Sequence, residues 1–557
     1  MLSYLCDPFQ MSSSKDRRLN IWTPILFAGV LCFGMTLGFR LRDTLRNKRN
    51  IEAVIERNDR LEEIIDLITE QYVDTVNTNA LYSDAVDGIL SHLDPHTSYI
   101  PAGQLNEVNE DLEGSFFGIG VEFNIVSDTI RVTSVVEGGP AERAGVALGD
   151  QLIRVNDSVV AGRGITSERI IKMLRGKQFS RATVTLKDAI SLKPKRVVIV
   201  RDAVPIYSVE ANLMLDGETG YIKINRFAAT THEEFVKAMR GLQARGMKSL
   251  ILDLRQNPGG FLDQAVAIAD EFLDGDKTIV ETRGRKEQQL DKAQYPGLFE
   301  SGKLAVLIDE SSASASEVLA GAIQDWDRGV ILGRRSFGKG LVQAQYDLGD
   351  GSALRLTIAK YYTPSGRSVQ RSFAKGKAAY QADFEHRFQN GELVGYDTVY
   401  HSDSSVYYTS SRRRVYGGGG IMPDIAVPYD SALLNGTFLN LVYGDALGIA
   451  VWEYYAAHIG SLKKYTSLGA FLRGIGSGDD VVAYCMERLP MQDRLVAERS
   501  MKQPVLRTYL ETQILARLAR ILYRSNGYYA VAVRQDNSVN RAMKLLQSKE
   551  YSSFVIR

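Results

Sequence analysis

The sequence predicts a mixed α/β protein with an inserted β-rich module and a helical C-terminal extension. From Thr219 onward, continuous apolar runs alternate with helical patterns, and such runs are typical of strands buried on both faces of a sheet. Residues 114–202 instead show short alternating strands with one helix, and the chain after Pro428 is mostly helical in pattern. The apolar runs are Tyr221-Ile222-Lys223-Ile224, 250–254, 304–308 and 330–332.

Length, composition and charge exclude several classes of protein for this chain. The 557 residues allow three or four domains at roughly 100–200 residues each, and 45% apolar with 24% charged residues excludes a wholly disordered chain. A net charge of +1 gives no bulk attraction to nucleic acid, so no nucleic-acid partner is expected. The cysteines are Cys6, Cys32 and Cys485, and the first two precede or lie in an apolar segment, so a disulfide-built fold is excluded.

The N-terminal region contains a candidate membrane anchor. Residues 19–39 carry no charge and span about 31 Å as a helix, which matches a bilayer core. The charged Arg40 and Arg42 follow where a cleaved signal peptide would need small residues, so an uncleaved anchor is predicted, with residues 1–50 forming a cytoplasmic tail and the anchor. Leu31 before Cys32 argues against lipid attachment.

The orientation of this anchor has two conflicting indications. More Lys and Arg residues follow the span than precede it, which by the positive-inside count places the following domains in the cytoplasm. The family resemblance given below implies export instead, and we weight it more heavily because the margin in charge is small.

Residues 51–113 form a predicted N-terminal helical region. Apolar residues recur at helical spacing over 51–75, and a second helix is expected at about 80–92. The turn 93–99 ends it, because Pro95 disfavours the α conformation in the residue before it.

The β-rich module at 114–202 carries three glycine-rich segments in order, and these resemble a PDZ domain. They are Phe116-Phe117-Gly118-Ile119-Gly120-Val121, Glu137-Gly138-Gly139-Pro140-Ala141 and Gly149-Asp150-Gln151-Leu152-Ile153. Glycines let backbone N–H groups turn inward around a terminal carboxylate, and a strand edge accepts the peptide as an added strand. Gly118, Ile119, Gly120 and Val121 are therefore the predicted peptide-binding residues, although Gly118 and Gly120 could also merely serve a hairpin.

Two segments of the α/β part carry candidate catalytic chemistry. Ser314 lies between the buried run 304–308 and a helix, where free N–H groups and the positive helix end favour negative charge, although serine is also a common helix cap. Lys339 has Gln343 four residues later, on the same face if both lie in a strand. A lysine can deprotonate serine only when neutral, so burial would have to lower its pKa from about 10.4 to about 7–8.

Together these segments resemble the C-terminal processing peptidases, also called tail-specific proteases, over about residues 60–430. The motifs are Ser312-Ala313-Ser314-Ala315-Ser316-Glu317, Phe337-Gly338-Lys339-Gly340, the turn Leu93 to Tyr99, Leu252 to Gly260, Tyr361 to Arg367, and Gly418 to Asp424. The resemblance implies a crotonase-like α/β peptidase core over 203–430 and a homo-oligomer. The polar composition of residues 372–416 indicates an insertion in this core. No H-E-x-x-H motif or Cys/His cluster with ligand spacing suggests a metal, and no cofactor is expected. The resemblance leaves the role of the helical domain 431–557 open.

The resemblance also assigns roles to individual residues. It makes Ser314 the nucleophile and Lys339 the general base, and Gln343 orients the lysine. The oxyanion would be held by the backbone N–H groups of Ala315 and of either Gly259 or Gly260. The implied function is a serine endopeptidase that cleaves exported proteins near their C-termini, with substrate tails captured by the PDZ domain. The catalytic domain would then lie in the periplasm or another extracytoplasmic space.

Two further residues, Asp325 and His96, are expected to be structural. Asp325 lies near the end of the helix that starts at Ser314, where a carboxylate opposes the helix dipole and needs a partner, for which Arg328 is the candidate. His96 lies in a proline turn with no paired acid, so a Ser-His mechanism is not expected.

Two alternatives come from other classes. Residues 333–339 match the glycine and lysine spacing of a P-loop, but Gly340 stands where a magnesium-binding Ser or Thr is required and 341–346 indicates a strand, so nucleotide binding is rejected. A catalytically inactive, membrane-tethered PDZ scaffold is the remaining alternative.

Overall fold

The computed structural model describes residues 60–126, 128–189, 191–395 and 405–555. The chain divides into two compact units, residues 1–92 and 93–557. In the described part of the first unit, a helix over 60–71 is followed by α2 (Thr78–Leu90), which begins at the N-cap Asn77. The predicted anchor at 19–39 lies outside the described residues, and within them no helix is both long enough and apolar enough to span a membrane.

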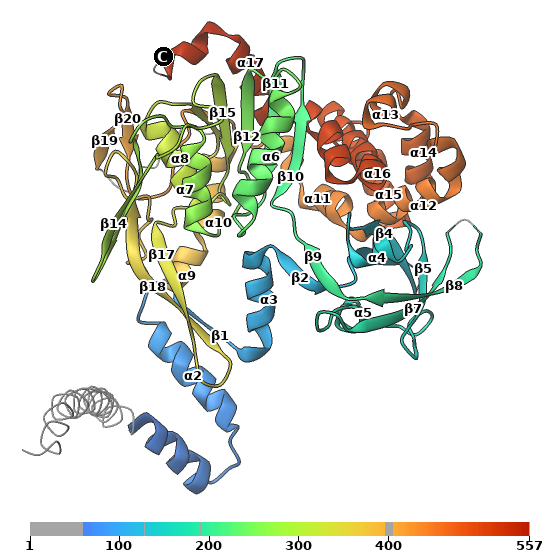
Figure 1. Cartoon of the computed structure of the whole chain (residues 1–557), viewed down its shortest axis with the longest axis horizontal. Helices are drawn as coiled ribbons and strands as arrows, with labels where there is room; N and C mark the ends of the chain where they lie inside the picture. The colour runs from blue at the N-terminus through green and yellow to red at the C-terminus, as the bar shows by residue number, and fades with distance from the viewer. Residues whose placement is uncertain (1–59, 127, 190, 396–404, 556–557) are drawn as a thin grey trace, which may run out of the picture. The chain divides into compact units, whose positions relative to one another are not determined.

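The second unit is built on a six-stranded central sheet in the order β10-β11-β12-β15-β16-β21. Figure 1 labels β10, β11, β12 and β15 of this sheet. Pairing is parallel from β11 to β21, and β10 runs antiparallel to β11. The sheet strands are β10 (Val209–Met214), β11 (Thr219–Ile224), β12 (Ser249–Asp253), β15 (Lys303–Ile308), β16 (Val330–Gly333) and β21 (Ile425–Ala426).

The apolar runs form these strands because both faces of the sheet are covered. On one face Ile222, Leu252 and Val306 pack against α6 (Thr231–Gln243), α7 (Leu262–Asp270) and α8 (Ala315–Asp325). On the other face Ile251 and Leu307 pack against α17 (Asn537–Gln547). Alternate residues of one strand thus enter different apolar cores, which explains the absence of a polar face.

A second sheet lies beside this core and carries part of the candidate site. Its order is β1-β18-β13-β14, with β17 also paired to β18. The strands are β1 (Ser98–Ile100), β13 (Thr278–Gly284), β14 (Gln288–Lys292), β17 (Leu341–Asp347) and β18 (Ala353–Tyr362). The strand predicted at 341–346 is therefore present as β17, where a P-loop would need a helix.

The β-rich module enters and leaves the core through a paired ribbon. After α3 (Ala102–Glu113), strands β2 (Ser115–Gly118) and β9 (Asp202–Pro205) pair antiparallel, so the module between them is an insertion. Its own sheet has the order β3-β4-β5-β7-β8, with β6 paired to β5. The elements are β3 (Val121–Val126), β4 (Thr129–Val135), α4 (Pro140–Arg143), β5 (Gln151–Val155), β6 (Ser158–Val159), α5 (Ser167–Leu174), β7 (Arg181–Lys187) and β8 (Pro194–Val200).

The polar segment at 372–416 packs more closely than its composition indicates. It contains α9 (Lys377–Gln381), α10 (Asp383–Gln389), η1 (Glu392–Val394), β19 (Val406–Tyr408) and β20 (Arg414–Tyr416). Arg387 is buried and donates to the carbonyls of Arg335 and Ser336, just before the predicted base. This insertion is thus anchored to the candidate site.

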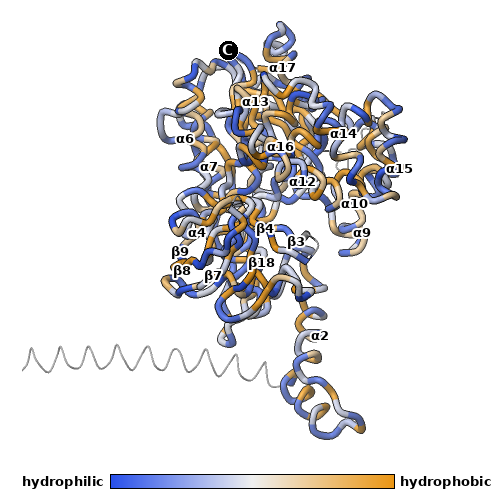
Figure 2. The backbone as a smooth tube through the Cα atoms, turned by 90° about the vertical axis from the view of Figure 1, so that its right-hand side faces the viewer, coloured by the Kyte–Doolittle hydropathy of each residue, from blue (hydrophilic) through white to orange (hydrophobic). Residues whose placement is uncertain are grey.

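The C-terminal part is helical, as predicted, and apolar segments alternate with polar ones along its helices (Figure 2). The helices before α17 enclose their own apolar core, whereas α17 covers the central sheet. They are η2 (Ser431–Leu434), α11 (Gly436–Tyr443), α12 (Asp445–Leu462), α13 (Leu468–Gly474), α14 (Asp479–Arg488), α15 (Met491–Ser500), α16 (Pro504–Ala532) and η3 (Val533–Gln535), and η4 (Lys549–Ser553) follows α17.

Candidate active site

Ser314 lies at the turn between β15 and α8 with a backbone conformation that serine rarely adopts. Its φ is 54° and its ψ is −113°, and such strain typically costs about 1–3 kcal/mol. The neighbouring serines, Ser312 and Ser316, are fully buried, and their hydroxyls hold the backbone. Ser312 donates to the carbonyl of Leu254, and Ser316 donates to the carbonyl of Asn257. Ser314 is only partly buried and stands at the positive end of α8.

The glycine pair 259–260 lies directly beside this serine. A Cβ atom on Gly259 would be 2.8 Å from Ser314 Cβ and 3.0 Å from the Ala315 nitrogen, and its φ is +99°, so a side chain does not fit there. Gly259 N–H donates to Asn257 Oδ1 at 2.9 Å. For the N–H groups of Gly260 and Ala315, no acceptor occurs among the described residues.

Lys339 follows β16 in a loop and precedes β17, which carries Gln343. Lys339 Nζ donates to Gln343 Oε1 at 2.9 Å, so the four-residue spacing brings the two side chains together. Burial, and next the positive charge of Arg355, lower the pKa of Lys339. The cause is the loss of hydration of the ammonium form, which favours the neutral amine.

Glu317 connects the serine turn to the lysine loop, although its motif predicts no role for it. Its buried carboxylate accepts from Ser314 N–H at 2.9 Å, from Ser336 Oγ at 2.6 Å, and from the N–H groups of Gly338 and Lys339 at 2.7 and 2.8 Å. Burial raises the pKa of Glu317 despite these donors. The only sequence signal was the Ser-x-x-Glu capping pattern, which indicates the bond to Ser314 but not the bonds to the lysine loop.

Tyr361, from the Tyr-Tyr-Thr-Pro motif, also joins the two segments. Its hydroxyl lies 2.7 Å from the Lys339 carbonyl oxygen and 3.1 Å from that of Ser314, so both backbones are held by one buried ring. Serine and lysine are therefore positioned by shared contacts.

The turn at 93–99 supports Gln343 through a backbone carbonyl. Gln343 Nε2 donates to His96 O at 2.6 Å, and Asp94 Oδ1 accepts from the N–H groups of His96 and Thr97. The His96 ring is 2.8 Å from Tyr380 Oη in α9. Burial, and next the charge of Lys339, lower the pKa of His96 to about 4, so the ring is neutral near pH 7. The geometry thus gives His96 a structural contact, in keeping with the sequence analysis.

Replacing His96 by phenylalanine should therefore reduce kcat/KM by less than about tenfold. The carbonyl that holds Gln343 is retained, and only the hydrogen bond to Tyr380, roughly 1 kcal/mol, is lost. Steady-state cleavage of a peptide reporter measures this. A loss of about 10³-fold, as expected for a general base, would instead assign the proton transfer to His96.

The partner of Asp325 differs from the prediction. Asp325 Oδ1 lies 2.8 Å from Arg367 Nη2, and both residues are buried. Arg328, the expected partner, instead donates to the carbonyls of Phe272, Phe299 and Gly302. The segment 363–367 crosses the end of α8 and brings a buried guanidinium to Asp325, which local sequence could not indicate.

The four residues predicted to bind a peptide end run from the last residue of β2, Gly118, to the first residue of β3, Val121. The carbonyls of Ile119 and Gly120 accept from Ala141 and Val136, which fixes this loop. For the N–H groups of Ile119 and Gly120, no acceptor is found in the described part of the chain. In the described sheet β3 pairs only with β4, so its other edge could accept an added strand.

Known protein families match both the α/β part of the chain and the β-rich module. Peptidase family S41 matches residues 218–376, and the PDZ domain family matches 107–187. A carboxy-terminal-processing protease of Bartonella bacilliformis is 35% identical over 349 residues, which cover 62% of this chain and 79% of that protein. A probable CtpA-like serine protease of Staphylococcus aureus is 35% identical over 314 residues, which cover 56% of this chain and 62% of that protein.

Among solved structures, a photosystem II D1 C-terminal processing protease has 28% identity and a TM-score of 0.32, covering 56% of this chain and 89% of that one. The fold and the two family matches define a serine peptidase that carries a PDZ domain. The chain belongs to peptidase family S41, together with the carboxy-terminal-processing proteases.

Proposed function

We propose that this chain is a serine endopeptidase with a Ser314–Lys339 dyad that cleaves exported proteins near their C-termini. The observation that carries the proposal is the coupling of Lys339, whose pKa is lowered by burial, to the strained Ser314 turn through Glu317. A partly buried lysine amine whose only hydrogen-bond partner among the described residues is a neutral amide is suited to give up its proton.

In the proposed reaction, Lys339 Nζ takes the proton of the Ser314 hydroxyl as Oγ attacks the scissile carbonyl carbon. The resulting oxyanion accepts hydrogen bonds from Ala315 N–H and Gly260 N–H, and such donors commonly contribute about 3–4 kcal/mol each. Gly260 is favoured over Gly259 because Gly259 N–H already donates to Asn257. Lys339 then protonates the leaving amine, giving an ester on Ser314.

Hydrolysis of that ester completes the cycle. Lys339, neutral again, takes a proton from water as the hydroxide attacks the ester carbon, and the proton then returns to Ser314 Oγ. Gln343 keeps the amine in place throughout, because its own amide is held by the His96 carbonyl. One residue thus serves as base and acid in both half-reactions.

The PDZ domain would deliver the substrate. A free C-terminal carboxylate fits the N–H groups of Ile119 and Gly120, and the preceding residues would add to the edge of β3 at Val121.

For location, we propose that residues 19–39 anchor the chain in a membrane with the peptidase on the extracytoplasmic side, and that the protein assembles as a homo-oligomer.

Cleavage of a reporter peptide with an apolar free C-terminus tests this function. The wild type should cleave it, Ser314→Ala should be inactive, and amidation of the reporter's C-terminus should raise KM. Circular dichroism checks that the variant is folded. Equal cleavage by the wild type and Ser314→Ala would reject the nucleophile, and no cleavage by either would favour the inactive scaffold.

A further inference from the structure

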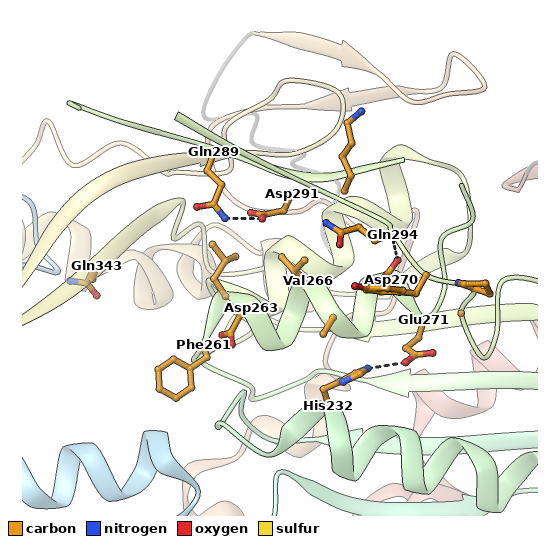
Figure 3. Close-up of a pocket in the computed structure, with 16 residues that line it drawn as sticks. His232, Phe261, Asp263, Val266, Asp270, Glu271, Gln289, Asp291, Gln294 and Gln343 are labelled. Carbon is orange, nitrogen blue, oxygen red and sulfur yellow. Dashed lines mark hydrogen bonds and ion pairs between the residues drawn. The ribbon is translucent and has the colours of Figure 1, made fainter. Parts of the chain in front are cut away.

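A groove lined by α7 and β14 has Gln343 at one end (Figure 3). It encloses about 620 Å³. Asp263, Val266 and Asp270 share one face of α7 because they are three to four residues apart, and Gln289 and Asp291 face them from β14. We call this cavity the α7–β14 groove.

The groove is continuous with the proposed site. Gln343, which holds Lys339, lies at one end of it, together with Phe261. Phe261 directly follows the glycine pair, whose Gly259 lies against Ser314. A polypeptide with its scissile carbonyl at Ser314 would therefore have this groove open beside it.

The dimensions suit an extended peptide segment. The 9 residues of α7 rise about 13 Å, and an extended chain rises about 3.3 Å per residue. The groove thus has the length of about four substrate residues on one side of the scissile bond.

The lining combines apolar surface with uncompensated negative charge. Phe261, Leu262, Val266 and Ala267 supply apolar surface. Asp263, Asp270 and Asp291 have no ion-pair partner among the described residues.

Local hydrogen bonds hold these carboxylates without neutralising them. Asp270 accepts from Gln294 N–H at 2.8 Å, and Asp291 accepts from Gln289 Nε2 at 2.8 Å. Asp263 accepts only from the side-chain amide of its neighbour Gln264, at 3.3 Å, as far as the described chain shows.

The basic side chains of the lining, Lys292 and His232, contact acids other than these three. Lys292 Nζ is 3.5 Å from Asp276, and His232 Nε2 is 2.8 Å from Glu271. Charge complementarity therefore calls for a cation from the occupant. Lysine and arginine fit because their aliphatic stems cover apolar surface while their charged heads reach carboxylates.

We propose that the α7–β14 groove binds the substrate segment next to the scissile bond and selects segments with lysine or arginine within about four residues of that bond. The proposal rests on the proposed peptidase function, and it adds a substrate class. The apolar C-terminus of the substrate would bind to the PDZ domain, and the basic residue would determine which peptide bond is cleaved.

Reporter peptides that share one apolar C-terminus test the groove. Each carries Lys, Ala or Glu at one of the four positions on either side of the scissile bond. On one side, Lys should give a kcat/KM about tenfold above Glu, and the ratio should fall as salt is raised from 50 to 500 mM. A Lys/Glu ratio near one at every position, with cleavage intact, overturns the groove proposal and leaves the peptidase function standing.

Variants assign the effect to the carboxylates. The triple variant Asp263→Asn, Asp270→Asn, Asp291→Asn should bring the Lys/Glu ratio close to one, and Asp291→Lys alone should favour Glu. Glu498→Gln, an exposed carboxylate of α15, is the matched control and should keep the wild-type ratio. A triple variant that retains the full ratio overturns the proposal.

A binding measurement separates the two proposals. If the wild type cleaves no reporter, the proposed function fails, and fluorescence anisotropy with Ser314→Ala and the same peptides still decides the groove. About tenfold tighter binding of the Lys peptides, lost in the triple variant, supports it. Equal binding of Lys and Glu peptides overturns it.

Discussion

Lys339→Ala should lower kcat/KM by about 10²–10⁴-fold while the protein remains folded. Among the residues that the structure describes, the amine is the only titratable group bonded to Gln343, and general-base catalysis commonly contributes 10²–10⁴-fold. Lys339→Arg should be equally inactive, because a guanidinium stays protonated. Initial rates with the tail reporter measure the loss, and thermal unfolding checks the fold.

The pH dependence gives a second readout of the same residue. The base acts only when neutral, so kcat/KM should rise with pH as Lys339 loses its proton. Because burial and Arg355 lower its pKa, the midpoint of this rise should lie below the usual lysine value of about 10.4. Arg355→Gln removes the repelling charge and should move the midpoint to higher pH.

For the alanine variant, activity within tenfold of wild type in Lys339→Ala would contradict the dyad.

Glu317→Ala should destabilise the protein by about 3 kcal/mol and reduce kcat/KM by about 10²-fold. It leaves buried donors from Ser314, Ser336, Gly338 and Lys339 without an acceptor, and each unsatisfied group has a desolvation penalty. The turn and the loop would also lose their common anchor. Urea denaturation gives the free energy of unfolding, and the tail reporter gives the activity.

The exposed Glu498→Ala serves as the comparison, since surface substitutions usually stay within about 0.5 kcal/mol. Glu317→Gln tests the role of the carboxylate itself, because glutamine keeps the size and shape of the side chain but places an NH₂ group, which is a donor, against the N–H donors. If Glu317→Ala were as stable and active as Glu498→Ala, the carboxylate would not couple serine to lysine.

The order of elements in the core was predictable from local sequence. The strand 304–308 contributes alternate residues to two apolar cores, so all of its residues are apolar. Such an apolar run can be recognised in the sequence without knowing which strands lie next to it in the sheet. The helical C-terminal part and the β-rich insertion also have local signatures in residue spacing and glycine pattern. Ser314, Lys339 and Gln343 were located by motifs, and the structure brings the last two into contact.

Other features had no local signature. The carbonyl of His96 supports Gln343, but every residue has a carbonyl, so no residue type marks this role. Asp325 finds Arg367 and not the nearby Arg328, because the crossing of segment 363–367 over α8 decides which guanidinium is buried there.

Helical and strand periodicity act over a few residues, so local sequence predicts the kind of each element and the residue types available for chemistry. The contacts of Glu317 with both the serine turn and the lysine loop, and the acidic groove between α7 and β14, arise only in the folded chain. These contacts join segments distant in the chain, so their partners depend on how whole elements pack.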